Sequence, residues 1–383
     1  MNVIKLVKNT IENYEVDELI DWLKTYPQLT QGPKVKEFEN LWSNFLNVKY
    51  STFVNSGSSA LLLSYYALFL TTGRRNIIVP ALSWATDLAP IIQFGLNPIL
   101  CDCNFNDLSL DLNHLEILLN EHSDAIVCLV SVLGLVPDME KIMNLKEQYN
   151  FILLEDVCES FGSEYKNQKL GSFGDVSVFS LFYGHHLSTI EGGMICTNDE
   201  NLNDVLKMIR AHGWDRELST DKQKALREKF SIDDFSAAYT FYYPGFNVRA
   251  TDLQAVLGIR QLFKSETIIN KRNENFNFIK NSLIVDWKPK QDENKFVSNF
   301  CYPIISIHKD KIVKKLIENK IECRPLICGS MGNQPFYLQN FKKCSLPNAS
   351  HIDKHGIYIP NNPDLTSNEL SFIVNVVNSA ILE

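Results

Sequence analysis

Residues suited to chemistry lie where short apolar runs end. In NSGSSALLL (55–63), a Gly-Ser-Ser turn precedes a run with helical character. The first amides of a helix have no partner within the helix and favour an anion. Gly57 and Ser58 are therefore candidates for binding a phosphate, although an ordinary serine helix cap explains the same residues.

A carboxylate follows the buried run in FILLEDVCESFG (151–162), which ends with Glu155 and Asp156. Open α/β sheets bind ligands at this end of their strands. Asp156 can therefore pair with a protonated ring nitrogen of a cofactor. The alternative is an aspartate that caps the following turn.

Two adjacent histidines form the third feature, in VFSLFYGHHLSTIEGGMICT (178–197). A strand is expected to end at Ser180, and the loop after it carries His185 and His186. An imidazole can move protons near neutral pH. Neighbouring residues point in divergent directions and no carboxylate or Cys lies at ligand spacing, so no metal site is expected. Two surface-loop histidines are the alternative.

Two further segments carry an aromatic residue and a polar turn. VPALSWATDLAP (79–90) places Trp84 after a strand, where it can stack on a planar cofactor or pack in the core. YYPGFNVRATDLQAVLG (242–258) has a Pro-Gly turn before Asn247 and Arg249, which can also be purely structural.

The elements that must position these residues alternate between β-rich runs and helical segments. Continuous apolar strands separated by helices predict a largely parallel sheet covered on both faces. The expected strands are 76–80, 98–102, 125–130, 151–156, 175–180 and 193–197.

The second half of the chain predicts a change of organisation. Residues 216–230 are highly charged and predict a surface excursion. Residues 251–276 read as one long helix. We expect a large domain with an N-terminal segment over 1–250, then this linking helix and a smaller C-terminal α/β domain over 251–383.

The composition of the chain indicates which kinds of binding partner and which cellular compartment to expect. The chain has 383 residues and a formal net charge of −8, which argues against nucleic acid as the main partner. The N-terminus lacks the features of a signal peptide, and no apolar run is long enough to span a membrane. The nine cysteines include no CxxC pair and predict reduced thiols, hence a cytoplasmic protein.

Taken together, the order and spacing of these segments resemble the DegT/StrS-type sugar aminotransferases, which depend on pyridoxal 5′-phosphate (PLP). The resemblance extends from about residue 30 to the C-terminus. It implies an α/β fold of the aspartate-aminotransferase type (fold type I), with a mixed, mostly parallel sheet in the large domain.

The resemblance also assigns roles to residues. Gly57, Ser58 and Ser180 correspond to the phosphate site, Trp84 to the aromatic residue over the pyridine ring, and Asp156 to the partner of the ring nitrogen. Glu159 falls where the family places Gln or His near the ring hydroxyl. Asn247 matches a residue that reaches the phosphate from the neighbouring subunit, which implies a homodimer with shared active sites.

The chain departs from the aminotransferases at residue 185. Five residues after Ser180, where the family has the Lys that binds the cofactor covalently, this chain has His185, and no Lys lies between Lys169 and Lys207. This exchange resembles the nucleotide-sugar 3-dehydratases, which use the pyridoxamine form (PMP) bound noncovalently, with a histidine as the proton carrier. One branch adds an iron–sulfur cluster held by cysteines. This chain has no Cys between Cys196 and Cys301, so it is more similar to the cluster-free branch that acts on GDP-4-keto-6-deoxymannose.

The implied substrates are a nucleotide-linked 4-keto-6-deoxy sugar and L-glutamate, which restores the cofactor amine. Arg324, His212, Arg216 and Ser330 are the expected substrate-binding residues, with surface or capping roles as the alternative for the first three. A nucleotide-sugar 4-aminotransferase and a catalytically silent nucleotide-sugar-binding homologue remain as other interpretations. Resemblance places the product in bacterial polysaccharide or O-antigen synthesis.

Overall fold

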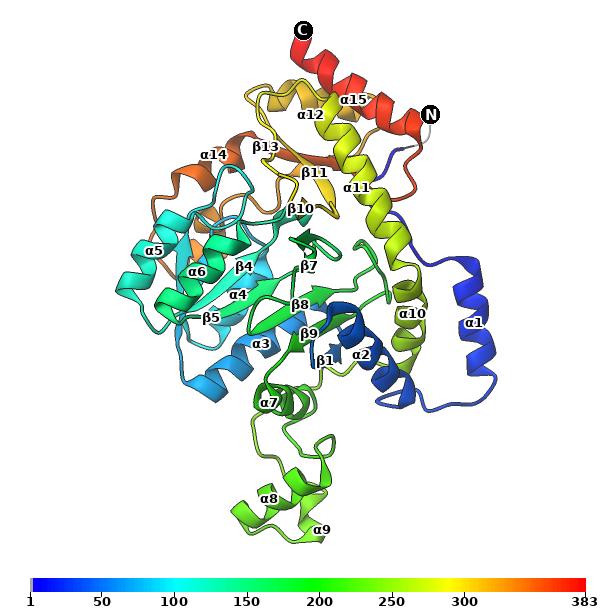
Figure 1. The fold of residues 1–383 in the computed structure, drawn as a ribbon, viewed down its shortest axis with the longest axis vertical. Helices are drawn as coiled ribbons and strands as arrows, with labels where there is room; N and C mark the ends of the chain where they lie inside the picture. Colours follow the sequence, from blue (N-terminus) through cyan, green and yellow to red (C-terminus); the bar gives the residue numbers. More distant parts are fainter. Residues whose placement is uncertain (1–2) are drawn as a thin grey trace.

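A seven-stranded sheet forms the centre of the protein in the computed structural model, which describes residues 3–383 (Figure 1). Strand β9 is antiparallel to both neighbours, and the other paired strands of this sheet are parallel. The sheet order is β1 (Tyr50–Val54), β9 (Gly193–Thr197), β8 (Val176–Ser180), β5 (Ile152–Asp156), β4 (Ile126–Val130), β2 (Asn76–Pro80) and β3 (Asn97–Cys101).

This sheet confirms the predicted mixed, mostly parallel α/β class. Each expected strand is present, with its ends within one residue of the prediction. The sequence analysis did not predict β1, which pairs with β9 and completes one edge of the sheet.

Helices cover the sheet and connect its strands. They are α1 (Asn13–Leu23), α2 (Pro33–Leu46), α3 (Gly57–Thr72), α4 (Ala85–Gln93), α5 (Leu112–Glu121), α6 (Met139–Tyr149) and α7 (Glu200–Arg210). A short 3₁₀ turn, η1, covers Val132–Gly134.

Local sequence explains where α3 begins and ends. The Ser56 hydroxyl accepts a hydrogen bond from the Ser59 amide at 3.0 Å and caps the N-terminus. Gly73, with φ +70°, ends the helix in the left-handed region. The helix between these caps is strongly apolar and packs against β8 and α7.

An aromatic cluster fixes α2 on the sheet. Phe38 and Trp42, one helical turn apart, are almost fully buried. Phe38 contacts Phe53 of β1 edge-on at 4.9 Å between ring centroids, and Trp42 contacts Phe179 of β8 at 5.2 Å. These contacts hold α2 against β1 and β8, the two strands that flank β9.

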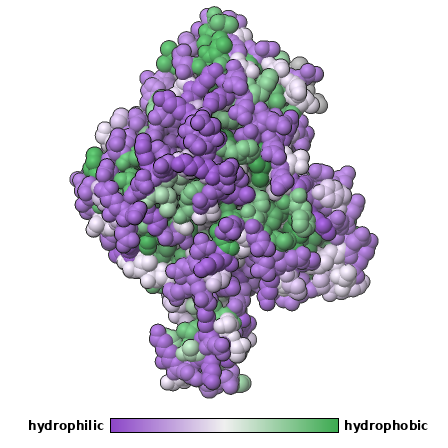
Figure 2. Space-filling model, viewed as in Figure 1, coloured by the Kyte–Doolittle hydropathy of each residue, from purple (hydrophilic) through white to green (hydrophobic). Residues whose placement is uncertain are grey.

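The charged excursion predicted at 216–230 projects from the body of the molecule (Figure 1). It contains α8 (Thr220–Phe230) and the short α9 (Asp234–Ala237). Figure 2 shows apolar groups among the hydrophilic surface there. The exposed aromatic residues of this segment are Phe230, Phe235, Tyr239 and Phe241.

The single long helix predicted over 251–276 is wrong. The structure has two helices, α10 (Asp252–Phe263) and α11 (Ser265–Ser282), which meet at Lys264. Lys264 has a ψ of 4°, which is outside the helical range, and its ammonium group contacts Thr10, Glu12 and Glu15 of the N-terminal segment. The break between α10 and α11 therefore lies where Lys264 contacts the N-terminal segment, and the local sequence pattern does not predict it.

The C-terminal part is a smaller α/β unit. Its sheet has the order β11 (Cys301–Ile305), β13 (Gly356–Pro360) and β12 (Arg324–Pro325). A second small sheet joins β10 (Lys295–Phe296), β6 (Glu164–Tyr165) and β7 (Gln168–Lys169). The remaining elements are α12 (Lys309–Glu318), η2 (Met331–Asn333), α13 (Pro335–Leu338), α14 (Pro347–His355) and α15 (Ser367–Leu382).

The N-terminal segment crosses from the C-terminal unit to α10. Ile4 pairs with Ile321, and the amide of Leu6 donates to Glu322 at 3.0 Å. Further along, the segment packs against the end of α10 through Thr10 and Glu15. Within residues 3–383, no helix is both long enough and apolar enough to cross a membrane.

Candidate active site

A cavity of about 360 Å³ opens at the carboxyl ends of the parallel strands. The turns after β1, β2, β4, β5 and β8 all contribute to it, as expected for an open α/β sheet. The predicted site residues that line this cavity are Gly57, Ser58, Trp84, Asp156, Glu159, Ser180 and His185.

The start of α3 forms one end of the cavity. A Cβ atom placed on Gly57 would lie 2.7 Å from the Cβ of Ser180, so α3 and the end of β8 are in close contact here. Ser56 caps the amide of Ser59, whereas Gly57 and Ser58 stand at the first helical positions, whose amides have no acceptor within the helix. These amides and the Ser180 hydroxyl form a donor set that fits a phosphate group.

Trp84 and Asp156 bound the middle of the cavity. Trp84 is 55% exposed and therefore is not a core residue. The Oδ1 atom of Asp156 accepts a hydrogen bond from the Cys158 amide at 2.8 Å, which fixes the carboxylate at the end of β5. A flat aromatic surface and a held carboxylate fit a planar ring with a protonated nitrogen.

Glu155, the neighbour of Asp156, has a structural role. Its buried carboxylate accepts hydrogen bonds from the amides of Gly171, Phe173 and Gly174, at 2.6 to 2.9 Å. The carboxylate thereby holds the loop before β8 in place.

Two other acidic groups near Asp156 have shifted pKa values. Burial raises the pKa of Glu159 to about 7, Asp156 adds to the shift, and a 2.9 Å hydrogen bond from the Leu133 amide opposes it. Burial, and secondly the charge of Asp156, raises the pKa of Asp87 well above its ordinary value. Asp87 accepts from the Trp84 amide at 2.9 Å, so it also holds the turn that carries Trp84.

The loop between β8 and β9 separates the two histidines. His185 lines the cavity, and its Nδ1 atom has no hydrogen-bond partner among the described residues. His186 is buried and is not among the lining residues, and its Nε2 lies 3.0 Å from the carbonyl oxygen of Ser298. The Phe300 ring lies near both imidazoles, at 5.3 Å from His185 and 6.2 Å from His186 between centroids. Residues 3–383 contain no cluster of three or more potential His, Cys, Asp or Glu metal ligands.

A buried cation lies behind His185. The Arg272 guanidinium donates to the carbonyl oxygens of Asn299, Phe300 and Asn361. The Phe300 ring lies 5.3 Å from the His185 ring between centroids, tilted by 36°. Burial lowers the pKa of His185 to about 4, and the positive charge of Arg272 contributes. His185 is therefore a neutral imidazole at neutral pH.

The remaining predicted residues are not among those that line the cavity of this chain. Asn247 pairs with Ala211 and lies with His212 and Arg216 at the root of the excursion. The Arg216 guanidinium stacks on Trp214 at 3.6 Å and donates to the carbonyl oxygen of Ala238.

In the C-terminal unit, Ser330 is buried and pairs with Leu82, close to the turn before Trp84. Arg324 is exposed on β12, where its register partner on β13 is Tyr358, a residue that does line the cavity.

Sequence reasoning missed several residues of the cavity wall. Ser131 and Glu191 follow or precede predicted strands, so a strict search of strand ends could have found them. Most of the others lie beside predicted residues in the same segments. They are Ser56, Leu61, Thr86, Val130, Cys158, Phe182 and Gly184. Val7, Phe300, Ile327 and Tyr358 carry no local signal, because they come from distant segments that only the fold brings together.

Comparison with known proteins identifies the family of the chain and several of its relatives. The model of the DegT/DnrJ/EryC1/StrS aminotransferase family matches residues 9–378. A GDP-4-keto-6-deoxy-D-mannose 3-dehydratase of Yersinia pseudotuberculosis is 34% identical over 365 residues, covering 91% of each chain. The enzyme of the same name from Escherichia coli O55:H7 is 35% identical over 366 residues, covering 91% of this chain and 92% of the relative.

A solved structure extends the similarity to three dimensions. It is a GDP-4-keto-6-deoxymannose-3-dehydratase with a trapped PLP-glutamate geminal diamine. The TM-score is 0.88 at 30% sequence identity, and the match covers 98% of this chain and 100% of the other.

Proposed function

Because the chain belongs to the DegT/DnrJ/EryC1/StrS aminotransferase family, we propose that it is a PMP-dependent nucleotide-sugar 3-dehydratase. In this activity the C3 hydroxyl of a GDP-4-keto-6-deoxy sugar is removed. One observation carries the proposal. The cavity is lined by the residues expected for the cofactor, but His185 stands in it and no lysine is among its described lining residues.

The residues of the cavity fit pyridoxamine 5′-phosphate held without a covalent bond. The amides of Gly57 and Ser58 and the Ser180 hydroxyl bind the phosphate, and Trp84 packs on the ring. Asp156 holds a proton on the ring nitrogen, which lets the ring, when bound, withdraw electrons from the bond that is to be broken. Glu159, with a pKa of about 7, shares a hydrogen bond with the ring hydroxyl.

His185 moves the proton in this proposal. With the cofactor bound, its neutral imidazole would accept a proton from the methylene carbon next to the cofactor amine. The same nitrogen would then donate the proton to the C3 hydroxyl oxygen, so that this oxygen leaves as water with the C3–O bonding pair. Because His185 is shorter and stiffer than a lysine, it does not deliver the proton to C4, where delivery would complete an amine transfer.

The other reactants follow from the same chemistry. L-Glutamate restores the cofactor amine and is oxidised to 2-oxoglutarate, which supplies the two electrons for the loss of the C3 oxygen. Its nitrogen is released as ammonia in each turnover. We propose no iron–sulfur cluster, because the chain between Cys196 and Cys301 has no cysteine. The 3-deoxy-4-keto product fits deoxysugar synthesis for a bacterial polysaccharide such as O-antigen.

Substrate binding and assembly complete the proposal. Asn247 reaches the phosphate of the neighbouring subunit in a homodimer, and His212 and Arg216 lie beside it at the same face. Arg324 binds the diphosphate of the nucleotide, since a guanidinium offers paired planar donors. Ser330 lies near the sugar, between Arg324 and the turn that carries Trp84.

The direct test is mass spectrometry of the product. Purified protein is incubated with PLP, L-glutamate and GDP-4-keto-6-deoxymannose, with the His185→Asn variant as the control. A product that lacks one oxygen, together with released ammonia, supports the 3-dehydratase. An amino sugar overturns it in favour of the 4-aminotransferase, and no conversion of the sugar with any nucleotide favours a silent binding homologue.

A further inference from the structure

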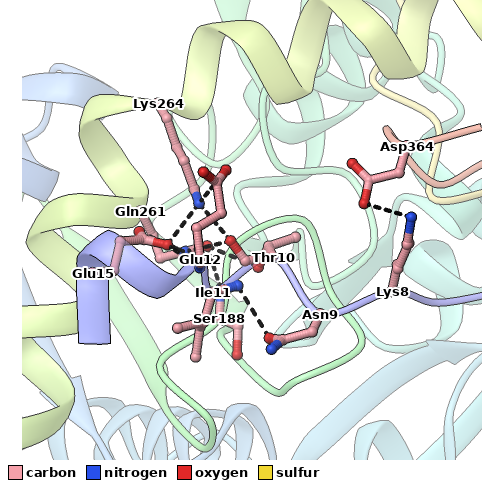
Figure 3. A network of polar contacts seen from close by, with 10 residues as sticks. All are labelled: Lys8, Asn9, Thr10, Ile11, Glu12, Glu15, Ser188, Gln261, Lys264 and Asp364. Atoms are coloured by element: carbon pink, nitrogen blue, oxygen red, sulfur yellow. Dashed lines mark hydrogen bonds and ion pairs between the residues drawn. The ribbon is translucent and has the colours of Figure 1, made fainter. Parts of the chain in front are cut away.

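A buried polar cluster lies directly beside the loop that carries His185, outside the cavity (Figure 3). It joins Thr10 and Glu15 of the N-terminal segment, Ser188 of the loop, and Gln261 near the end of α10. All four residues are at most 7% exposed. Residues so far apart in the sequence meet here because the N-terminal segment runs along α10.

The surroundings of Gln261 determine the orientation of its amide. Its Nε2 donates to the carbonyl oxygen of Thr10 at 3.0 Å and to Glu15 at 2.8 Å. An ionised carboxylate only accepts hydrogen bonds, so the amide nitrogen must face Glu15. The Oε1 atom therefore points the other way, where it accepts from the Thr10 hydroxyl at 2.8 Å and from the Ser188 amide at 3.2 Å.

The carboxylate of Glu15 is itself held on several sides. The Lys264 ammonium contacts it at 2.7 Å, and the Glu12 amide donates to it at 2.7 Å as part of the cap of α1. A buried carboxylate is stable only with such partners. Glu15 is thus a fixed acceptor that orients Gln261.

A second contact links the same N-terminal segment to the loop. Val7 lines the cavity, and a Cβ on Gly184 would lie 3.3 Å from a methyl group of Val7. The segment therefore packs against the residue before His185, while Gln261 holds the loop three residues after it. The solvent-exposed Lys8–Asp364 ion pair, at 3.0 Å, lies between these two contacts along the segment.

From this geometry we infer that Gln261 is a positioning residue for His185, and that residues 7–15 support the histidine loop, with Val7 alone of this segment in the cavity wall. The Gln261 amide fastens the loop at Ser188 to the N-terminal segment, which keeps the imidazole in the cavity. This inference rests on the proposed role of His185. It assigns Gln261 no contact with substrate or cofactor.

The test compares two variants that each lose one buried amide. Gln261→Met keeps the volume but removes the acceptor for the Ser188 amide. Asn275→Leu is the matched control, because Asn275 is equally buried but donates to the carbonyl oxygen of Asn362, in the C-terminal unit. Hydrogen–deuterium exchange of peptides covering 181–192 is measured on the protein loaded with PLP, together with kcat and KM for the sugar.

For Gln261→Met we expect exchange in 181–192 to be at least about tenfold faster, and kcat to fall by about ten- to a hundredfold with KM little changed, since a small misplacement of a reacting group has effects of this size. Asn275→Leu should change neither. If Gln261→Met does not fold, the milder pair Thr10→Val and Thr10→Ser replaces it. Loss of the hydroxyl should loosen the loop and lower kcat in the same direction, and serine should restore both.

Two results would overturn the inference. One is loop exchange in Gln261→Met equal to that of the wild type, and the other is a kcat that falls no more than in Asn275→Leu. Failure of the proposed function is separate: the wild-type protein then forms no deoxy sugar, and the exchange measurement alone decides whether Gln261 fastens the loop.

Discussion

At the scale of single residues, the surroundings of His185 and Glu159 shift their pKa values in opposite directions. Burial, and secondly the positive charge of the buried Arg272, lowers the pKa of His185. Glu159 is buried near Asp156, so its proton affinity is high. A neutral imidazole and a carboxyl group that titrates near neutrality are suited to opposite proton-transfer roles in one cavity.

Replacing His185 tests its role as the proton carrier. His185→Asn should slow formation of the deoxy sugar by about a hundredfold or more, the usual effect of losing a general base. His185→Lys should abolish deoxygenation and bind PLP covalently, which mass spectrometry after borohydride reduction would detect. Deoxygenation by the lysine variant would contradict the role that we propose for His185.

The pH profile distinguishes the two titrating residues. Glu159 is protonated below about pH 7 and His185 is unprotonated above about pH 4, so the two active forms coexist between these values. We expect kcat/KM to decline as pH rises through about 7, when Glu159 loses the proton that it donates. In the Glu159→Gln variant the glutamine amide donates at every pH, so the decline of kcat/KM above about pH 7 should disappear. The decline at low pH, which comes from protonation of His185, should remain. An unchanged decline in the glutamine variant would show that another group causes it.

At the scale of elements, the site depends on how strand ends meet helix starts. The close approach of α3 to the end of β8 requires glycine at position 57, because any Cβ there would overlap Ser180. The Ser56 hydroxyl accepts from the amide of Ser59 and not from those of Gly57 and Ser58, so these two amides can donate to an anion. The phosphate site is therefore a property of two elements in contact.

Gly57→Ala should consequently weaken cofactor binding. The new methyl group would force α3 and β8 apart, so we expect the Kd of PMP to rise by about tenfold or more, which corresponds to 1.4 kcal/mol. Tryptophan fluorescence titration measures this. Thr71→Ala, at the other end of α3, removes a hydroxyl that donates to the carbonyl oxygen of Ala67, and it should leave the Kd unchanged. Equal affinities of wild type and Gly57→Ala would contradict the assignment of the phosphate site.

At the scale of the whole molecule, the predicted site residues fall into three groups. One group lines the cavity, a second, made of Asn247, His212 and Arg216, lies at the root of the α8–α9 excursion, and Arg324 and Ser330 belong to the C-terminal unit. The homodimer that we propose would unite the first two groups, each active site taking Asn247 from the partner. The division into 1–250 and 251–383 is a proposal, and across it Ile4 pairs with Ile321 of the C-terminal unit.

Mixing two inactive variants tests the shared site. In a heterodimer of His185→Asn and Asn247→Ala protomers, one of the two sites would have both native residues. Random exchange of subunits should therefore restore activity to about a quarter of the sites. Each variant refolded alone is the control. No recovery after confirmed subunit exchange would show that Asn247 does not act across an interface.

The sequence by itself determined six of the seven strands of the central sheet, all except β1, together with the polar residues at their ends and the exchange of lysine for His185. These are local properties, since burial sets the composition of a strand and the strand end sets where its polar residues lie. Tertiary structure alone decided that α10 and α11 separate at Lys264, that Phe300 and Tyr358 complete the cavity wall, and that Gln261 links the histidine loop to Thr10 and Glu15. The reason is that these features depend on packing between segments up to about 250 residues apart, and no local pattern encodes which distant side chain will be the partner.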